Sequence, residues 1–139
     1  MSTLDKAILI AAKAHLNQTD KGGKPYILHC LRVMFSMETE EEMITAVLHD
    51  TIEDTDISID DLRKESISED ILTALQLLTY DEAMSYEDYI LSIKTNALAK
   101  KVKLADLKDN ANIFRVNTFD EKVCKKLNKY FLSYKKLTE

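Results

Sequence analysis

Glycine and proline, the residues that most often interrupt helices, are almost absent from this chain of 139 residues. There are two glycines and one proline, and all three lie between Gly22 and Pro25. A chain with so few helix breakers is expected to be helical along most of its length, with a loop at residues 20–24. Strand signals are limited to short β-branched clusters. The sequence therefore predicts an all-α fold.

Most of the expected helices begin with a Ser or Thr that is followed three residues later by an acidic side chain, the pattern of an N-terminal cap. Thr39 with Glu42 is one example. Apolar residues at helical spacing, such as Ile71, Leu75 and Leu78, support the same assignment. We expect one domain, residues 1–139, folded as a helical bundle around a single core. The expected helices span residues 3–18, 26–37, 40–51, 59–64, 69–79, 86–94, 97–114 and 119–137.

Composition narrows the classes of protein to which the chain can belong. Hydrophobic residues make up 45% of it, yet no apolar run is long enough to span a bilayer. The first residues lack the features of a secretory signal, so we expect a cytoplasmic protein. The net charge of -5, with both signs interspersed, argues against a nucleic-acid polymer or a membrane as partner. The Lys-rich residues 122–136 are best interpreted as a solvated helix face. The sequence leaves open whether the chain forms a homo-oligomer.

Ionisable side chains gather in the segment from His49 to Asp54, which reads His-Asp-Thr-Ile-Glu-Asp. If the helix continues through this segment, His49 lies one turn from Glu53, and Asp50 lies one turn from Asp54. Three carboxylates this close together repel one another, and burying them requires a neutralising charge. A divalent cation is the simplest neutralising group. The alternative is an exposed acidic helix end.

Two other segments carry residues that could complete a metal site. Pro25 suits the first position of a helix, which then carries His29 at a defined orientation. Asp106 lies among apolar residues in the middle of an expected helix, and Asn110 follows one turn later on the same face. A buried aspartate needs a partner, which a metal would supply. Two imidazoles and two carboxylates suit Mn²⁺, Fe²⁺ or Zn²⁺ better than Ca²⁺ or Mg²⁺ alone.

Three segments together resemble the HD-domain metal-dependent phosphohydrolases, and they are most similar to the hydrolase half of the RelA/SpoT alarmone enzymes. The first segment covers residues 14–29, with Lys-Pro-Tyr-Ile-Leu-His at its end. The second covers residues 46–55 and contains the His-Asp and Glu-Asp pairs. The third covers residues 102–110, with the sequence Val-Lys-Leu-Ala-Asp-Leu-Lys-Asp-Asn. The three motifs occur in the expected order and span most of the chain, which makes the resemblance specific.

The resemblance implies an HD-type helical bundle that binds one divalent ion. This ion is usually Mn²⁺, with Fe²⁺, Zn²⁺, Co²⁺ and Mg²⁺ as alternatives. In alarmone hydrolases the reaction removes pyrophosphate from the 3′ position of ppGpp-type nucleotides, so a small-molecule nucleotide or phosphate ester is the expected substrate. Glu53 and Asp54 are implied to position or activate the attacking water. The implied metal ligands are His29, His49, Asp50 and Asp106.

One position departs from the family pattern. Alarmone hydrolases typically carry an Arg directly before the Lys of the first motif, and Asp20 occupies that place here. It puts a negative charge where a contact to a base or phosphate is expected. The residues expected to bind substrate are Lys21, Arg32, Lys103 and Asn110, and ordinary surface charge is the alternative for the three basic ones.

Three functions are compatible with these motifs. The first is hydrolysis of a nucleotide phosphate or pyrophosphate, which is favoured because the whole set of implied site residues is present. The second is a catalytically weak HD domain that binds or senses a nucleotide, which Asp20 suggests. The third is a helical interaction protein without a site. Within the first motif, His15 could brace the site or be an ordinary helix residue. Tyr26 is expected to pack under the loop rather than stack on a base.

Overall fold

The computed structural model describes all 139 residues and contains nine α-helices, one 3-10 helix and no strand. An isolated β-bridge joins Thr19 to Pro25 across the one long loop of the N-terminal half. The predicted all-α bundle is confirmed. No helix is both long enough and apolar enough to cross a membrane. The helices are α1 (Thr3–Ala14), α2 (Ile27–Phe35), α3 (Glu40–Leu48), α4 (Thr51–Asp54), α5 (Ile59–Lys64), α6 (Glu69–Leu78), α7 (Tyr86–Lys94), α8 (Ala97–Asn110), η1 (Ile113–Arg115) and α9 (Glu121–Thr138).

Side-chain caps explain where several helices begin. Ser2, Thr39 and Ser58 each form a capping box, in which the hydroxyl accepts from the third backbone N–H of the helix and an acidic side chain accepts in return. Ser68 and Ser85 cap α6 and α7 through the hydroxyl alone. Each such cap contributes about 1 kcal/mol to helix stability. The spacing of Ser, Thr and acidic residues therefore predicts these starts correctly.

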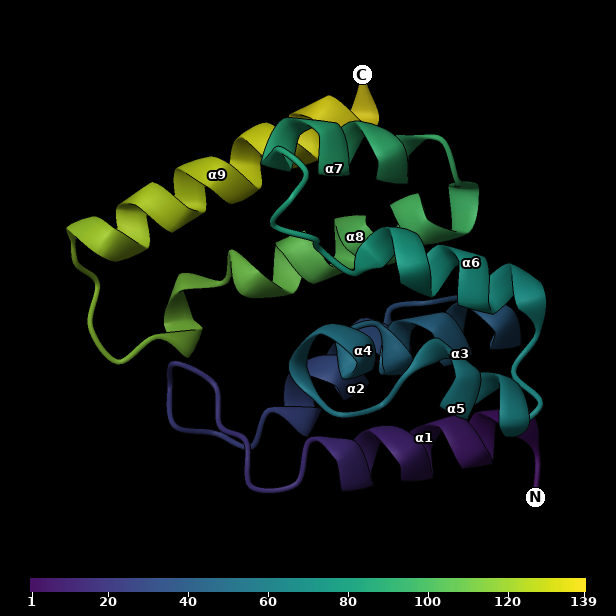
Figure 1. Cartoon of the computed structure of the whole chain (residues 1–139). Helices are drawn as coiled ribbons and strands as arrows, with labels where there is room; N and C mark the ends of the chain where they lie inside the picture. Colours follow the sequence, from purple (N-terminus) through teal and green to yellow (C-terminus); the bar gives the residue numbers. More distant parts are fainter.

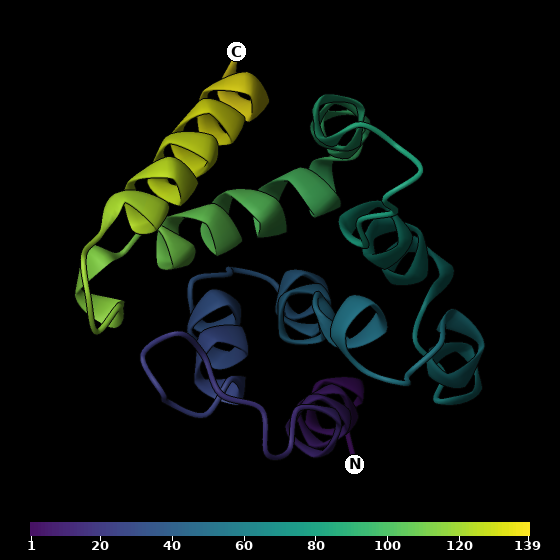
Figure 2. The same cartoon turned by 60° about the vertical axis from the view of Figure 1, so that its left-hand side comes forward.

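Helix α8 lies at the centre of the bundle and contacts α2, α3, α6, α7 and α9. Helices α1, α2 and α3 lie on one side of it, and α7 and α9 lie on the other (Figure 1). Figure 2 shows the same two groups in a turned view, with α8 between them. The core consists of 24 buried hydrophobic residues that come from both groups. Side chains on α8 that face α2 and α3 therefore lie in the interior.

Two predicted helices end earlier than expected. The first helix stops at Ala14, because the chain turns at Asn17, whose φ of 69° lies in the left-handed region. The helix predicted to span residues 97–114 stops at Asn110, and residues 113–115 form a separate 3-10 turn. The residues that follow each early end belong instead to the loops that surround the site described below.

The expected continuous helix through His49 and Asp50 is wrong. Helix α3 ends at Leu48, and Asp50 has φ -104° and ψ 0°, so the chain changes direction before α4. Side chains satisfy the carbonyl groups at this break. The imidazole Nδ1 of His49 lies 2.6 Å from the Ala46 carbonyl oxygen, and the hydroxyl of Thr51 donates to the Leu48 carbonyl at 2.7 Å. Because these hydrogen bonds replace the helical ones, the break is stable inside the protein.

Candidate metal centre and substrate cavity

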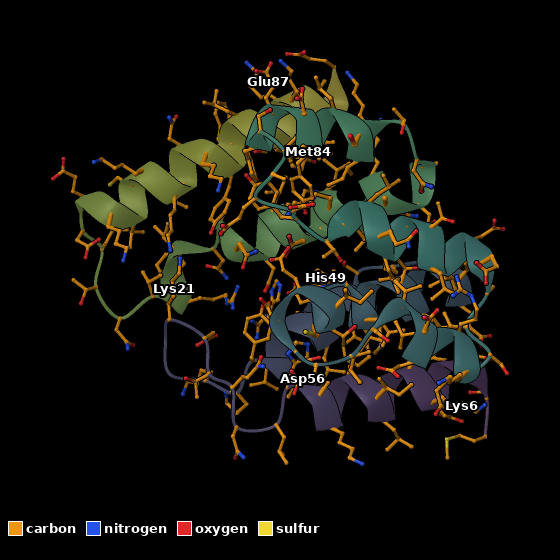
Figure 3. The ribbon with its side chains drawn as sticks, viewed as in Figure 1. Lys6, Lys21, His49, Asp56, Met84 and Glu87 are labelled. Atoms are coloured by element: carbon orange, nitrogen blue, oxygen red, sulfur yellow. The ribbon has the colours of Figure 1, made fainter.

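The four predicted metal ligands lie together in the structure. His29 comes from α2, His49 and Asp50 follow α3, and Asp106 comes from α8, and one donor atom of each lies within 4.8 Å of the others. Oδ1 of Asp106 lies 3.0 Å from Nε2 of His29 and 3.2 Å from Nε2 of His49. Both histidines and Asp106 are buried, and Asp50 is partly buried. Figure 3 shows His49 in the interior of the bundle.

Both imidazole rings are oriented by hydrogen bonds at Nδ1. Nδ1 of His49 meets a backbone carbonyl, which can only accept, so this nitrogen carries the proton and donates. Nδ1 of His29 lies 2.5 Å from Oδ2 of Asp109. Each ring therefore presents Nε2 to the same point, as is usual for histidines that bind metal ions. Two imidazole nitrogens and two carboxylates, converging from three elements, fit one divalent cation.

The electrostatics of the cluster also fit a cation. Burial acts to raise the pKa of Asp106, but the nearby charges of Lys103 and His49 hold that pKa well below its usual value. Burial acts to lower the pKa of His49, yet the charges of Asp50 and Asp106 raise it well above the usual value. The carboxylates therefore stay ionised in the interior and attract positive charge.

Glu53 and Asp54 lie on α4, directly after the break, and both line the cavity described next. Oε1 of Glu53 accepts a hydrogen bond of 2.6 Å from the backbone N–H of Tyr80. Burial, and then the charges of Asp50 and Glu53, raise the pKa of Asp54 to about 6. A carboxylate whose pKa lies close to neutrality suits proton transfer near pH 7.

A cavity of about 510 Å³ opens beside the cluster, a size that suits a small-molecule ligand. Its walls come from the loop before α2, from α4, from the end of α8 with η1, and from the first half of α9. Asn110 lines it and donates through Nδ2 to Oδ1 of Asp106 at 2.9 Å. Asn110 therefore links the cavity to the cluster.

Positive charge gathers in one part of this cavity. Lys21, on the loop at the outer edge of the molecule in Figure 3, lines the cavity together with Lys126 of α9 and Arg115. Burial, and then the neighbouring Lys126 and Lys122, lower the pKa of Lys21 to about 8. Like charges held this close favour an anionic ligand between them. Part of the Lys-rich segment predicted as a solvated helix face thus contributes to the cavity.

Other residues expected to bind substrate lie elsewhere. Nζ of Lys103 is 3.0 Å from Oδ2 of Asp106 and largely buried, so this side chain braces the cluster from inside. Arg32 forms a two-pronged ion pair with Asp109 and lines a different hollow, between α2, α8 and α9. The structure thus brings Lys21 and Asn110 to the cavity, but it does not bring Arg32 there.

Several residues of the site have roles that the sequence did not indicate. Tyr26, expected to pack under the loop, packs against the ring of His15 and also donates a hydrogen bond to Asp50. Asp109 contacts His29, and its position one turn after Asp106 in the third motif is a signal that could have pointed to it. Arg115 had no local signal, since its partner Asp20 lies 95 residues away.

Comparisons with known proteins identify relatives of this chain. No protein-family model matches the chain. The chain is 30% identical over 142 residues to the guanosine-3′,5′-bis(diphosphate) 3′-pyrophosphohydrolase MESH1 of Drosophila melanogaster, covering 93% of this chain and 79% of that protein. It is 31% identical over 138 residues to a guanosine-3′,5′-bis(diphosphate) 3′-pyrophosphohydrolase of Aquifex aeolicus. That match covers 91% of this chain but only 19% of the relative, so the chain spans about a fifth of that protein.

A solved structure has the same fold. It belongs to a metazoan ortholog of SpoT, described as hydrolysing ppGpp and playing a role in starvation responses. The TM-score is 0.77 at 27% identity, and the match covers 99% of this chain and 84% of that one. The bundle and its buried His–Asp cluster thus define a hydrolase with a candidate metal centre. The chain belongs to the family of guanosine-3′,5′-bis(diphosphate) 3′-pyrophosphohydrolases.

Proposed function

We propose that this protein is a metal-dependent pyrophosphohydrolase that acts on a nucleotide with a 3′-diphosphate, such as guanosine-3′,5′-bis(diphosphate). The observation that carries the proposal is the convergence of two histidines and two aspartates beside a cavity that is lined in part by Lys21, Arg115 and Lys126. The name of the Drosophila relative supports the substrate class. Residues 1–139 would act as one domain, because the proposed ligands come from helices far apart in the chain. A nucleotide substrate also agrees with a cytoplasmic location.

The proposed metal ligands are His29, His49, Asp50 and Asp106. Mn²⁺ is the proposed ion, and Fe²⁺, Zn²⁺, Co²⁺ and Mg²⁺ are the alternatives. When bound, a divalent ion would supply a Lewis acid that polarises a phosphoryl oxygen and lowers the pKa of water. Nε2 of both imidazoles faces the cluster, because Nδ1 of each ring is engaged in a hydrogen bond on the other side.

The carboxylates of Glu53 and Asp54 are proposed to orient the attacking water and take its proton. The pKa of Asp54, raised to about 6, lets that group accept a proton near neutral pH and release it again. The water oxygen would form a bond to the phosphorus attached to the 3′ oxygen, and the bond between that phosphorus and the 3′ oxygen would break. The 3′ oxygen then receives a proton, and pyrophosphate leaves.

Lys21 and Lys126 are proposed to hold an anionic part of the substrate away from the reacting phosphorus. Both line the cavity, and burial followed by the nearby positive charges of Lys126 and Lys122 lowers the pKa of Lys21 to about 8. A substrate with negative charge at two ends would satisfy both the cation at the cluster and the lysines. Guanosine-3′,5′-bis(diphosphate) has that distribution of charge.

A test of this proposal is release of pyrophosphate from the purified protein with Mn²⁺ present. The substrates would be guanosine-3′,5′-bis(diphosphate), GTP, deoxynucleoside triphosphates, NADPH and model phosphate esters. We expect pyrophosphate from the 3′-substituted nucleotide, and none after the metal is removed with a chelator. A protein that binds no divalent ion and is inactive on every substrate would refute the proposal.

Binding of a nucleotide without hydrolysis is the second candidate function, because Asp20 replaces the Arg of the family pattern. The same assay separates the two functions. Intact nucleotide, recovered in complex with the metal-loaded protein after a long incubation, would favour binding alone.

A further inference from the structure

Asp109 lies one turn after Asp106 on α8, and its carboxylate meets the far side of a proposed metal ligand. Oδ2 of Asp109 is 2.5 Å from Nδ1 of His29, while Nε2 of the same ring is 3.0 Å from Oδ1 of Asp106. The imidazole is therefore held between two carboxylates of one helix. Since Asp109 engages Nδ1, the nitrogen that faces the cluster is Nε2.

Two arginines hold the Asp109 carboxylate in place. Nε of Arg32 donates to Oδ1 at 2.8 Å, and one terminal nitrogen of Arg115 donates to Oδ2 at 2.8 Å. The same terminal nitrogen of Arg115 also donates to the backbone carbonyl of Asp109 at 2.9 Å. Rotation of the carboxylate away from His29 would break these charge-assisted hydrogen bonds, which are among the stronger ones in proteins.

Arg115 extends this network to the loop that carries Lys21. Its other terminal nitrogen is 3.1 Å from Oδ2 of Asp20. Oδ1 of Asp20 accepts from the backbone N–H groups of Gly22 and Lys24, both at 2.9 Å, which shapes the loop. A continuous series of contacts thus runs from the loop through Asp20, Arg115 and Asp109 to His29. Asp20, the departure from the family pattern, is an anchor for Arg115 in this chain.

We infer that Asp109 is a positioning residue that fixes the orientation of His29 for metal binding, with Arg32 and Arg115 holding its carboxylate. The inference rests on the proposed metal centre and concerns how that centre is kept in shape. Carboxylates that contact the outer nitrogen of a metal-binding histidine typically change metal affinity or activity by about 10–100-fold when removed. Asp109 has the geometry of such a group, and the arginines explain why it does not rotate away.

The test measures Mn²⁺ affinity without substrate, by calorimetric titration of the wild-type protein and of Asp109→Ala and Asp109→Asn. We expect Asp109→Ala to weaken Mn²⁺ binding by about 10–100-fold. The Mn²⁺ affinity of Asp109→Asn should lie between those of the wild type and Asp109→Ala. The amide oxygen can still accept from His29, but the amide NH₂ then faces a guanidinium group. Asp70→Asn is the matched control, since Asp70 is exposed on α6, away from the cluster.

A second readout separates positioning from a purely structural role. The rise in melting temperature on adding Mn²⁺ should shrink in both Asp109 variants and stay unchanged in Asp70→Asn. If Asp109→Ala does not fold, Asp109→Asn decides the question alone. Folded variants that bind Mn²⁺ as tightly as the wild type would overturn the inference and leave the proposed function standing. A wild-type protein that binds no divalent ion would overturn both.

Discussion

The phenol of Tyr26 donates a hydrogen bond of 2.5 Å to Oδ2 of Asp50. The same oxygen lies 3.0 Å from Nε2 of His49, so Tyr26 sets the rotation of a carboxylate that belongs to the cluster. The ring of Tyr26 packs between the rings of His15 and His29, with centroid distances of 5.1 and 5.5 Å. Tyr26 of the first motif therefore contributes to the site through its hydroxyl group and through tilted aromatic contacts.

Replacing Tyr26 with Phe keeps the aromatic packing and removes only the hydroxyl. We expect Mn²⁺ affinity to fall about tenfold, because Asp50 loses the group that orients it. The free energy of unfolding of the metal-free protein should fall by about 1 kcal/mol. Tyr80→Phe is a suitable control, since that phenol donates to the Met84 carbonyl outside the cluster. Equal Mn²⁺ affinity for Tyr26→Phe and the wild type would contradict this role.

Replacing Glu53 with Gln, or Asp54 with Asn, should separate chemistry from metal binding. Neither side chain belongs to the four-residue cluster. We expect hydrolysis to slow by about 10²–10⁴-fold, the usual range for loss of a general base, while Mn²⁺ affinity changes little. Glu65→Gln, at the exposed end of α5, serves as the control. Loss of Mn²⁺ binding in the Glu53 and Asp54 variants would instead indicate that these residues are ligands.

Replacing Asp106 with Ala tests whether the cluster is a site or merely part of the core. The change leaves two imidazoles and the ammonium group of Lys103 without their shared carboxylate. We expect the metal content of the purified protein and its hydrolytic activity to disappear together. The free energy of unfolding should fall by about 3–5 kcal/mol, as when one partner of a buried ion pair is removed. Unchanged metal content and activity in Asp106→Ala would show that Asp106 is not part of a metal site.

As pH rises, deprotonation of Lys21 should weaken substrate binding but increase the stability of the protein. Its pKa in the folded protein is about 8, below the ordinary 10.5, so the folded state releases this proton first as pH rises. Stability should therefore increase between about pH 8 and pH 10.5 from this group, while KM for an anionic substrate should rise as the charge is lost. Lys21→Arg keeps its charge throughout this range and should remove both trends. An unchanged KM profile in Lys21→Arg would show that another group titrates.

Replacing Asp20 with Arg restores the residue of the family pattern but places two guanidinium groups together. Asp20 and Arg115 form an ion pair whose side chains are 8% and 17% exposed. We expect Asp20→Arg to lower the free energy of unfolding by about 3 kcal/mol, because Arg115 then faces a second guanidinium group and keeps only Asp109 as a carboxylate partner. The double variant Asp20→Arg with Arg115→Asp should recover part of this loss. Unaltered stability in Asp20→Arg, measured by chemical denaturation, would show that the pair is unimportant.

Much of the fold follows from local signals. The scarcity of glycine and proline and the caps at Thr39 and Ser58 predict helices that the structure confirms. The break after Leu48 could not be predicted in this way, because apolar spacing continues through it. The carbonyl groups there are satisfied by the side chains of His49 and Thr51, and both residues are also compatible with a regular helix.

The candidate site also combines features that the local sequence indicates with contacts that it does not indicate. His49 and Asp50 are adjacent in sequence, so a pattern can single them out, and the family resemblance adds His29 and Asp106. The contacts that orient these residues are tertiary. Tyr26 reaches Asp50 over 24 positions, and Asp109 reaches His29 over 80. Only a fold brings such pairs together, and nothing in the local sequence marks Tyr26 as a hydrogen-bond donor.

The position of α8 between the two groups of helices has a consequence for the amount of protein that a cell can keep. His29 and Asp106 are 77 residues apart in the chain, so a metal ion held by both joins the N-terminal helices to the C-terminal half. An ion that binds only the folded state at a hundredfold excess over its Kd adds about 2.7 kcal/mol of stability. Differences of this size change how much protein escapes proteolysis. Scarcity of the metal would therefore lower the abundance of this protein as well as its turnover.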